Sequence, residues 1–177
     1  MIIDKTLIEG AFLITRTPAV DNRGSFARMF CQREFEKAGI EQDFKQINLC
    51  NNYKRGTLRG LHYQKGGKLE DKLVACTSGR IYDVCADIRK ESATYGKHVA
   101  FELSEQNGRM LYIPKGCAHG YVTLEDNSQL LYLMSEFYVP GLEGGYRYDD
   151  PFLAVNWPVD ENLVISEKDL MLPYITE

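Results

Sequence analysis

Hydrophobic positions occur in short runs rich in β-branched and aromatic residues, and long helical periods are rare. Such residues favour strands, and turn-forming segments at 65–68 (KGGK), 105–109 (EQNGR) and 124–129 (LEDNSQ) separate several of the runs. Many short strands broken by turns are typical of a β-sandwich, a jelly roll or a barrel. The pattern predicts strands at 11–18, 25–30, 59–64, 72–77, 80–88, 98–103, 109–114, 117–124 and 129–139.

Two segments predict short helices instead. Residues 31–39 (CQREFEKAG) are amphipathic and end at Gly39, a typical residue just beyond a helix. Residues 166–169 (SEKD) have the S-x-x-D form of a capping box. The chain of 177 residues shows no internal repeat or linker, and its length suits one hydrophobic core. We therefore expect a single domain over residues 1–177.

Charge narrows the possible partners. The chain has 21 basic and 25 acidic residues and a net charge of -4, so it lacks the basic surface that nucleic acid requires. The first ten residues carry charges where a signal peptide needs an apolar core, and no stretch approaches the roughly 18 apolar residues of a membrane span. We expect a soluble, cytoplasmic protein without nucleic-acid or membrane partners.

The cysteines are five in number, widely spaced, and never form a CxxC pair. An odd number without paired spacing argues against structural zinc and against a disulfide framework. A free thiol usually behaves as a small buried hydrophobe. We predict that role for Cys31, Cys50, Cys76, Cys85 and Cys117.

The three histidines are the side chains that titrate nearest neutral pH. His98 lies in a predicted strand, and a structural role explains it adequately. His62 follows Gly56 by six positions in GTLRGLH, whereas His119 closes the segment GRMLYIPKGCAH. These two segments resemble the signature motifs of the cupin superfamily, which are small jelly-roll barrels with their chemistry inside, although Thr123 stands where the second motif has Asn.

The first motif departs from that of a metal-binding cupin. Such a cupin has H-x-H followed by Glu, but Gln64 takes the place of the second histidine here. A neutral amide replaces imidazole poorly around a transition metal. Glu70 could supply a carboxylate, so a metal site remains an alternative, as does a structural role for both His62 and His119.

Without a metal, the residues suit proton transfer next to a carbonyl group. Arg59, Lys72 and Arg23 could bind an anionic ligand or stabilise an enolate. Tyr132 and Tyr138 could act as general acids or line a pocket. The chain has 11 tyrosines, however, so simple packing is an alternative for both.

The chain also resembles one family more closely. The dTDP-4-dehydrorhamnose 3,5-epimerases share its ordered motifs from about Arg23 to Asp169. This resemblance implies a cofactor-independent isomerase that inverts C3, C5 or both in a nucleotide-linked 4-keto-6-deoxy sugar, for deoxysugar or surface polysaccharide (lipopolysaccharide) synthesis. The shared segments are RGSF, QIN, RGLHYQ, KLV, YDVCADIR, YIPKGCAHGY, LLYLMSEFY, DDP, NWP and SEKD.

The resemblance implies four catalytic residues. His62 matches the base of the family, and Asp169 matches the carboxylate that orients the base. Lys72 matches a lysine ten positions after the histidine, and Tyr132 matches the acid proposed for the opposite face of the sugar. Simpler roles are a helix cap for Asp169 and an exposed strand position for Lys72.

The resemblance also implies substrate contacts. Arg59 and His119 match residues around the sugar and phosphate, and Tyr138 and Glu143 match further ligand contacts. Arg23 matches an arginine that the family contributes from a neighbouring subunit, which implies a homodimer. The nucleotide end is matched by Gln46 and Asn48.

The largest departure from the family concerns the nucleotide. Arg28 stands where the family has a glutamate that contacts thymine, and reversing a charge should change which base is tolerated. CDP or GDP could therefore replace dTDP. Three other functions stay open from the sequence: a sugar 3,4-ketoisomerase, a metal-dependent cupin, and a sugar-binding jelly roll without turnover.

Overall fold

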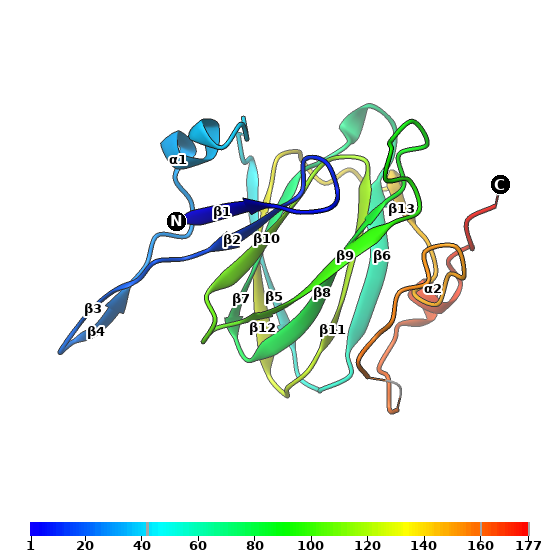
Figure 1. Cartoon of the computed structure of the whole chain (residues 1–177). Helices are drawn as coiled ribbons and strands as arrows, with labels where there is room; N and C mark the ends of the chain where they lie inside the picture. The colour runs from blue at the N-terminus through cyan, green and yellow to red at the C-terminus, as the bar shows by residue number, and fades with distance from the viewer. Residues whose placement is uncertain (42, 160, 177) are drawn as a thin grey trace.

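The computed structural model describes residues 1–41, 43–159 and 161–176, and within them two main antiparallel sheets face each other (Figure 1). The predicted mainly β sandwich of jelly-roll type is confirmed. The six-stranded sheet has the order β1 (Ile2–Lys5), β2 (Phe12–Thr15), β10 (Arg109–Ile113), β7 (Lys72–Ser78), β12 (Ser128–Met134) and β5 (Gln46–Asn52). The five-stranded sheet has the order β13 (Glu143–Gly145), β6 (Leu58–Gln64), β11 (Cys117–Thr123), β8 (Arg80–Asp87) and β9 (His98–Ser104).

Short elements lie around the sandwich. Helix α1 (Gln32–Lys37) is followed by Gly39 at φ 80°, which confirms the predicted end of this helix. Helix α2 (Glu167–Leu170) begins with the predicted cap, because the Ser166 side chain accepts a hydrogen bond of 3.1 Å from the Asp169 backbone N–H. A single 3₁₀ turn covers Gly66–Lys68. No helix in the described ranges is long and apolar enough to cross a membrane.

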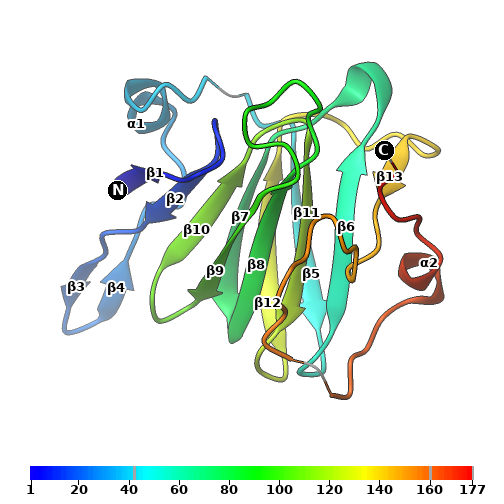
Figure 2. The same cartoon turned by 45° about the vertical axis from the view of Figure 1, so that its right-hand side comes forward.

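A small hairpin of β3 (Ala19–Asp21) and β4 (Gly24–Phe26) projects away from the sandwich in both overall views (Figures 1 and 2). The strand predicted at 25–30 is therefore wrong beyond Phe26. Phe30 instead packs on Phe35 of α1, with ring centroids 5.0 Å apart. Strand β5 was not predicted, because its amide residues are uncommon in strands. The neighbouring strand β12 supplies its pairing.

Apolar residues of the two facing sheets form the central core. Val74 and Leu130 come from the six-stranded sheet, Ile81 and Cys85 come from the other, and all four are fully buried. Each large aliphatic side chain buried in this way contributes roughly 1.5–3 kcal/mol. All five cysteines are free, but only Cys76, Cys85 and Cys117 are buried, whereas the other two are half-buried.

The register of the six-stranded sheet explains which side chains reach the interior. Residues directly opposite one another in an antiparallel pair point to the same face. Tyr132 lies opposite the core residue Val74 on one side and Asn48 on the other. Lys72 and Gln46 stand two positions from these residues on their own strands. Because side chains alternate along a strand, Lys72, Gln46, Asn48 and Tyr132 share the inner face.

An irregularity in the five-stranded sheet brings two further residues to the inner face. His62 lies opposite His119, but the register shifts before Arg59 pairs with Tyr121. In a regular strand, Arg59 and His62 would point to opposite faces, since they are three positions apart. Gly60 permits the shift: its φ is 130°, and a Cβ there would lie 2.5 Å from the backbone of β11.

Candidate active site

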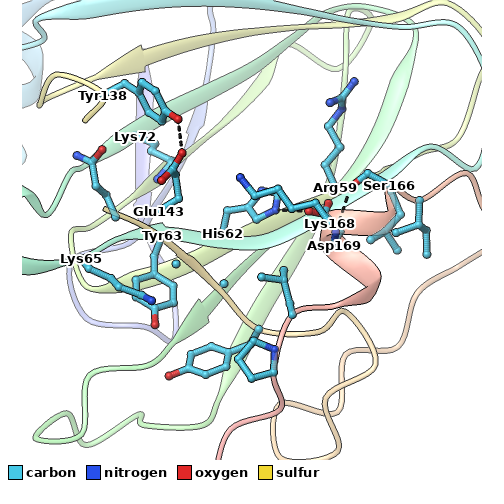
Figure 3. A pocket seen from close by; sticks show the side chains of 18 of the residues that line it. Arg59, His62, Tyr63, Lys65, Lys72, Tyr138, Glu143, Ser166, Lys168 and Asp169 are labelled. Carbon is cyan, nitrogen blue, oxygen red and sulfur yellow. Dashed lines mark hydrogen bonds and ion pairs between the residues drawn. The ribbon is translucent and has the colours of Figure 1, made fainter. Parts of the chain in front are cut away.

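A cavity of about 810 Å³ opens between β6, β13 and α2 (Figure 3). Its size is suited to a ligand larger than a simple metabolite. Figure 3 shows His62 near its centre, with Asp169 on one side and the Tyr138–Glu143 pair on the other. The predicted site residues that line it are Arg59, His62, Lys72, Tyr138, Glu143 and Asp169.

His62 and Asp169 form the centre of the site. His62 Nε2 lies 2.8 Å from Asp169 Oδ1, and the Gly60 N–H donates to Oδ2 at 3.3 Å. Burial tends to raise the pKa of Asp169, but the hydrogen bond and charge of His62, with further hydrogen bonds, hold it below its ordinary value. The ionised carboxylate only accepts hydrogen bonds, so Nε2 carries a proton, and in the neutral imidazole Nδ1 keeps the lone pair.

The two side chains of this pair differ in their exposure to solvent. The Asp169 side chain is 6% exposed, whereas that of His62 is 44% exposed and faces the cavity. The carboxylate of Asp169 is therefore used to hold His62, while the backbone of the same residue takes part in the helix cap. His62 is thus an imidazole that faces the cavity and is oriented by a buried carboxylate.

Lys72 is buried, with 6% exposure, so the alternative of an exposed strand residue is wrong. Its ammonium group forms an ion pair with Glu70 at the cavity wall. A buried charge needs such a partner, because its desolvation is otherwise costly. The arrangement places a positive charge where an anionic oxygen could develop.

Tyr132 lies on the inner face of the opposing sheet and does not line the cavity surface. Its ring packs edge-on against His119, with centroids 5.8 Å apart. Burial, followed by the influence of Tyr121 and Asp83, raises the pKa of Tyr132 well above its ordinary value. Tyr132 is therefore protonated at neutral pH and has a proton to donate.

His119 forms a second pair behind the cavity. Its Nε2 lies 2.7 Å from Asp83 Oδ1, and both side chains are buried. Burial raises the pKa of Asp83, and the nearby His119 offsets this only in part. His119 does not line the cavity, so its predicted contact with sugar or phosphate stays a prediction.

Arg59 is hydrogen-bonded to a cluster of polar side chains. Its Nε donates to Asn52 Oδ1 at 3.1 Å, and Tyr121 donates to the same oxygen at 3.0 Å. Cys50 Sγ lies 3.3 Å from the Tyr121 hydroxyl. These bonds fix the exposed guanidinium group at the cavity wall, where it can bind an oxyanion.

The rim of the cavity is formed by the segment that follows β12. The Tyr138 hydroxyl donates to Glu143, and the Tyr138 backbone N–H donates to Gln46 Oε1 at 2.6 Å. The hydrogen bond from Tyr138, aided by the Gly141 N–H, lowers the pKa of Glu143 to about 2. Gln46 therefore contacts the rim, whereas Asn48 lies on β5 at the inner face and is exposed.

Gln64 has a different role from the histidine that it replaces. Its amide nitrogen donates to the carbonyl groups of Lys68 (2.6 Å) and Phe137 (3.2 Å), and its oxygen accepts from the Val139 N–H at 3.1 Å. The amide thus joins the backbones of two rim segments. Among the described residues, no group of three or more His, Cys, Asp or Glu could hold a metal ion, so the metal-cupin alternative lacks a donor set.

Two predicted substrate residues lie away from the cavity of their own chain. Arg23 sits at the tip of the β3–β4 hairpin, 85% exposed and paired with Asp21. Arg28 pairs with Glu34 of α1 at 2.6 Å. Neither residue lines the cavity, so any contact with a ligand of this site would have to come from another copy of the chain.

Other residues line the cavity but were not predicted from the sequence. Lys168 lines the site beside Asp169, and its signal was the charged residue inside the capping box. Tyr63 stacks on Tyr146 with centroids 5.6 Å apart, but neighbours of a motif histidine carry no distinct signal. Lys65 lies in a segment whose glycines predicted only a turn.

Comparison with known proteins agrees with this geometry. The family model of the dTDP-4-dehydrorhamnose 3,5-epimerases matches residues 5–177. The chain belongs to this family. The Salmonella typhimurium dTDP-4-dehydrorhamnose 3,5-epimerase is 38% identical over 178 residues, which cover 100% of this chain and 97% of the relative. This membership makes the chain a nucleotide-sugar epimerase with a cupin-like fold.

Solved structures of similar epimerases include complexes with nucleotide sugars. An epimerase from Legionella pneumophila, in complex with dTDP-4-keto-L-rhamnose, has a TM-score of 0.93 and 36% identity, covering 97% of this chain and 91% of its own. A 3'-monoepimerase from Streptomyces bikiniensis, in complex with dTDP-quinovose, has a TM-score of 0.90 and 29% identity, covering 97% and 86%. Epimerases that differ in the carbons they invert therefore share this fold.

Proposed function

We propose that this epimerase inverts C3, C5 or both in a nucleotide-linked 4-keto-6-deoxy sugar through an enolate. The His62–Asp169 pair is the observation that carries the proposal. A ketone at C4 acidifies the hydrogens on C3 and C5, and His62 Nδ1 removes one of them. Asp169 then stabilises the imidazolium that forms. A positioned base of this kind contributes roughly 100- to 10,000-fold to the rate.

Two further residues complete the proposed reaction. Lys72 stabilises the negative charge on the enolate oxygen from the cavity wall. Tyr132 is protonated and half-buried on the sheet that faces His62. In this proposal the sugar ring reaches inward between the two sheets, where Tyr132 returns a proton to its opposite face. Inversion requires a base and an acid on opposite faces, and the two sheets supply one each. No redox step is involved.

The diphosphate and nucleoside occupy the remaining cavity in this proposal. Arg59 and Lys168 bind the phosphates at the wall, and His119 supports that end from behind. Tyr138 and Glu143 hold the nucleoside at the rim together with Gln46 and Asn48. The bases of thymidine, cytidine and guanosine are the candidates to compare.

A homodimer completes the site in this proposal. Arg23 lies on a hairpin that extends away from its own cavity, and it would reach the phosphates of a partner subunit. Arg28 would approach the partner's nucleotide from the base of the same hairpin. Apolar side chains are exposed on the hairpin and on β5, which is the opposite edge strand of the six-stranded sheet, and they would be covered in the dimer: Val20, Phe26, Ile47 and Leu49. The enzyme would act in the cytoplasm, in deoxysugar or surface polysaccharide synthesis.

Deuterium uptake from heavy water tests the proposal directly. The enzyme is mixed with 4-keto-6-deoxy sugars carried on dTDP, CDP and GDP, and exchange is read by mass and proton spectra. We expect exchange at C3, C5 or both with one nucleotide preferred. Movement of the ketone to C3 without inversion would contradict the proposal in favour of a ketoisomerase. Binding without exchange would indicate a sugar-binding protein.

A further inference from the structure

Glu70 is a cavity residue that the proposed reaction does not use. It lies at the end of the segment between β6 and β7, two residues before Lys72. Its Oε1 accepts a hydrogen bond from Lys72 Nζ, and the two side chains are only 10% and 8% exposed. Both line the same cavity. A nearly buried ion pair at this place fixes a charge that the reaction needs.

The segment that carries Glu70 is itself held in place. The Gln64 amide donates to the Lys68 carbonyl at 2.6 Å, and Ser135 Oγ accepts from the Asp71 N–H at 2.7 Å. The carboxylate of Glu70 therefore stands on a backbone that is anchored before and after it. A lysine side chain has a flexible four-carbon stem and loses much conformational entropy when it is fixed. A carboxylate on an anchored backbone orders the Lys72 side chain before the sugar binds, so binding does not have to remove this entropy.

We propose that Glu70 is the positioning residue for Lys72 and acts on proton transfer only through it. This inference rests on the proposed function. Glu70 accepts one of the three ammonium hydrogens, which leaves the others directed toward the enolate oxygen. Its own charge opposes the enolate only from behind the ammonium group, at a greater distance. The ion pair keeps the Lys72 ammonium group charged and fixed at a nearly buried position of the cavity wall, where an unpaired charge would be disfavoured.

The experiment uses Glu70→Gln, which keeps the shape and an acceptor but removes the charge. We expect turnover, measured as deuterium exchange at saturating sugar, to fall about tenfold, because small misplacements of a catalytic group are costly. KM should change less than about twofold, since Glu70 does not touch the sugar. Glu102→Gln is the matched control on β9, where Glu102 pairs with Arg80 at 3.6 Å outside the cavity. It should leave turnover unchanged.

A double-mutant cycle separates positioning from a general structural role. Lys72→Met alone should lower exchange about 100-fold or more, because it removes the charge that faces the enolate. In that background, Glu70→Gln should change exchange less than about twofold, or restore some folding stability by removing an unpaired buried carboxylate. Equal tenfold losses in both backgrounds would overturn the inference, as would unchanged or faster exchange in Glu70→Gln alone. Absence of exchange in the unmodified enzyme would instead refute the proposed function.

Discussion

The two histidine–aspartate pairs of this fold have almost the same geometry and opposite surroundings. The Nε2–Oδ1 distance is 2.8 Å for His62–Asp169 and 2.7 Å for His119–Asp83. The His62 side chain is 44% exposed to the cavity, whereas that of His119 is 6% exposed. Asp169 comes from a helix that borders the cavity, and Asp83 comes from the adjacent strand β8.

Pairing with an aspartate does not by itself identify a histidine as a base. A hydrogen bond to a carboxylate fixes the tautomer of either histidine, but only the pair that faces the cavity can reach a substrate proton. The pKa values differ as well: that of Asp169 is lowered, and that of Asp83 is raised. The first pair lines the cavity, whereas the second packs against Tyr132 in the interior.

Replacing the histidines gives the largest contrast. His62→Ala should reduce deuterium exchange at least 1,000-fold, within the roughly 100- to 10,000-fold range that a positioned base contributes. Nucleotide binding, measured by calorimetry, should stay within about threefold, because the nucleoside end contacts other residues. His98→Ala is the control: His98 bonds the Leu153 carbonyl at 2.9 Å and does not line the cavity. Full exchange by His62→Ala would refute the assignment.

Replacing the two aspartates compares the pairs directly. Asp169→Asn should lower exchange by roughly 100-fold, because an amide can stabilise the wrong tautomer of His62 and does not stabilise its imidazolium. Asp83→Asn should lower exchange less than about threefold at saturating sugar, because His119 does not face the substrate. Initial rates of both variants, with circular dichroism to verify folding, provide the measurement. A similar loss in both variants would mean that the buried pair also takes part in proton transfer.

Tyr132→Phe tests the residue that packs on the buried pair. Removing the hydroxyl should slow inversion about tenfold more than exchange, because His62 can still remove and return a proton on its own face. The ring remains, so its contact with His119 is preserved. Parallel product analysis and deuterium incorporation under the same conditions give both rates. Equal loss of the two rates would show that Tyr132 does more than return the proton.

The sequence indicated most of the fold, because strands with alternating or apolar patterns can be recognised locally. The motif around His62 likewise marked a residue that faces the cavity, and SEKD marked both a helix start and Asp169. The register shift at Gly60 could not be predicted, since it depends on how β6 meets β11. The same shift is what places Arg59 and His62 on one face. Strand β5 was missed because its pairing with β12 outweighs its local composition.

It was harder to predict from the sequence which residues line the cavity than to predict the kind of reaction. Glu70 was visible only as a doubtful metal ligand, because its pairing with Lys72 depends on the path of the segment between two strands. Arg28 was assigned to the nucleotide, but its partner in the same chain is Glu34. A charged residue at a motif position does not show whether its side chain contacts the site of its own subunit or the site of a partner.

The smallest expected effect is on stability, and its sign differs between the two pairs. The folded-state pKa of Asp169 is lowered, so its contribution to the free energy of unfolding is present above the unfolded pKa and is lost as pH falls through the folded value. The folded-state pKa of Asp83 is raised, so the folded protein holds its proton more tightly and stability falls as pH rises between the two values. Urea unfolding across the acidic range, for the parent, Asp169→Asn and Asp83→Asn, measures both. The parent's advantage over Asp169→Asn should grow with rising pH, and its advantage over Asp83→Asn should shrink. Slopes of the same sign would show that the two carboxylates do not occupy the opposite electrostatic environments that distinguish the cavity-facing pair from the buried one.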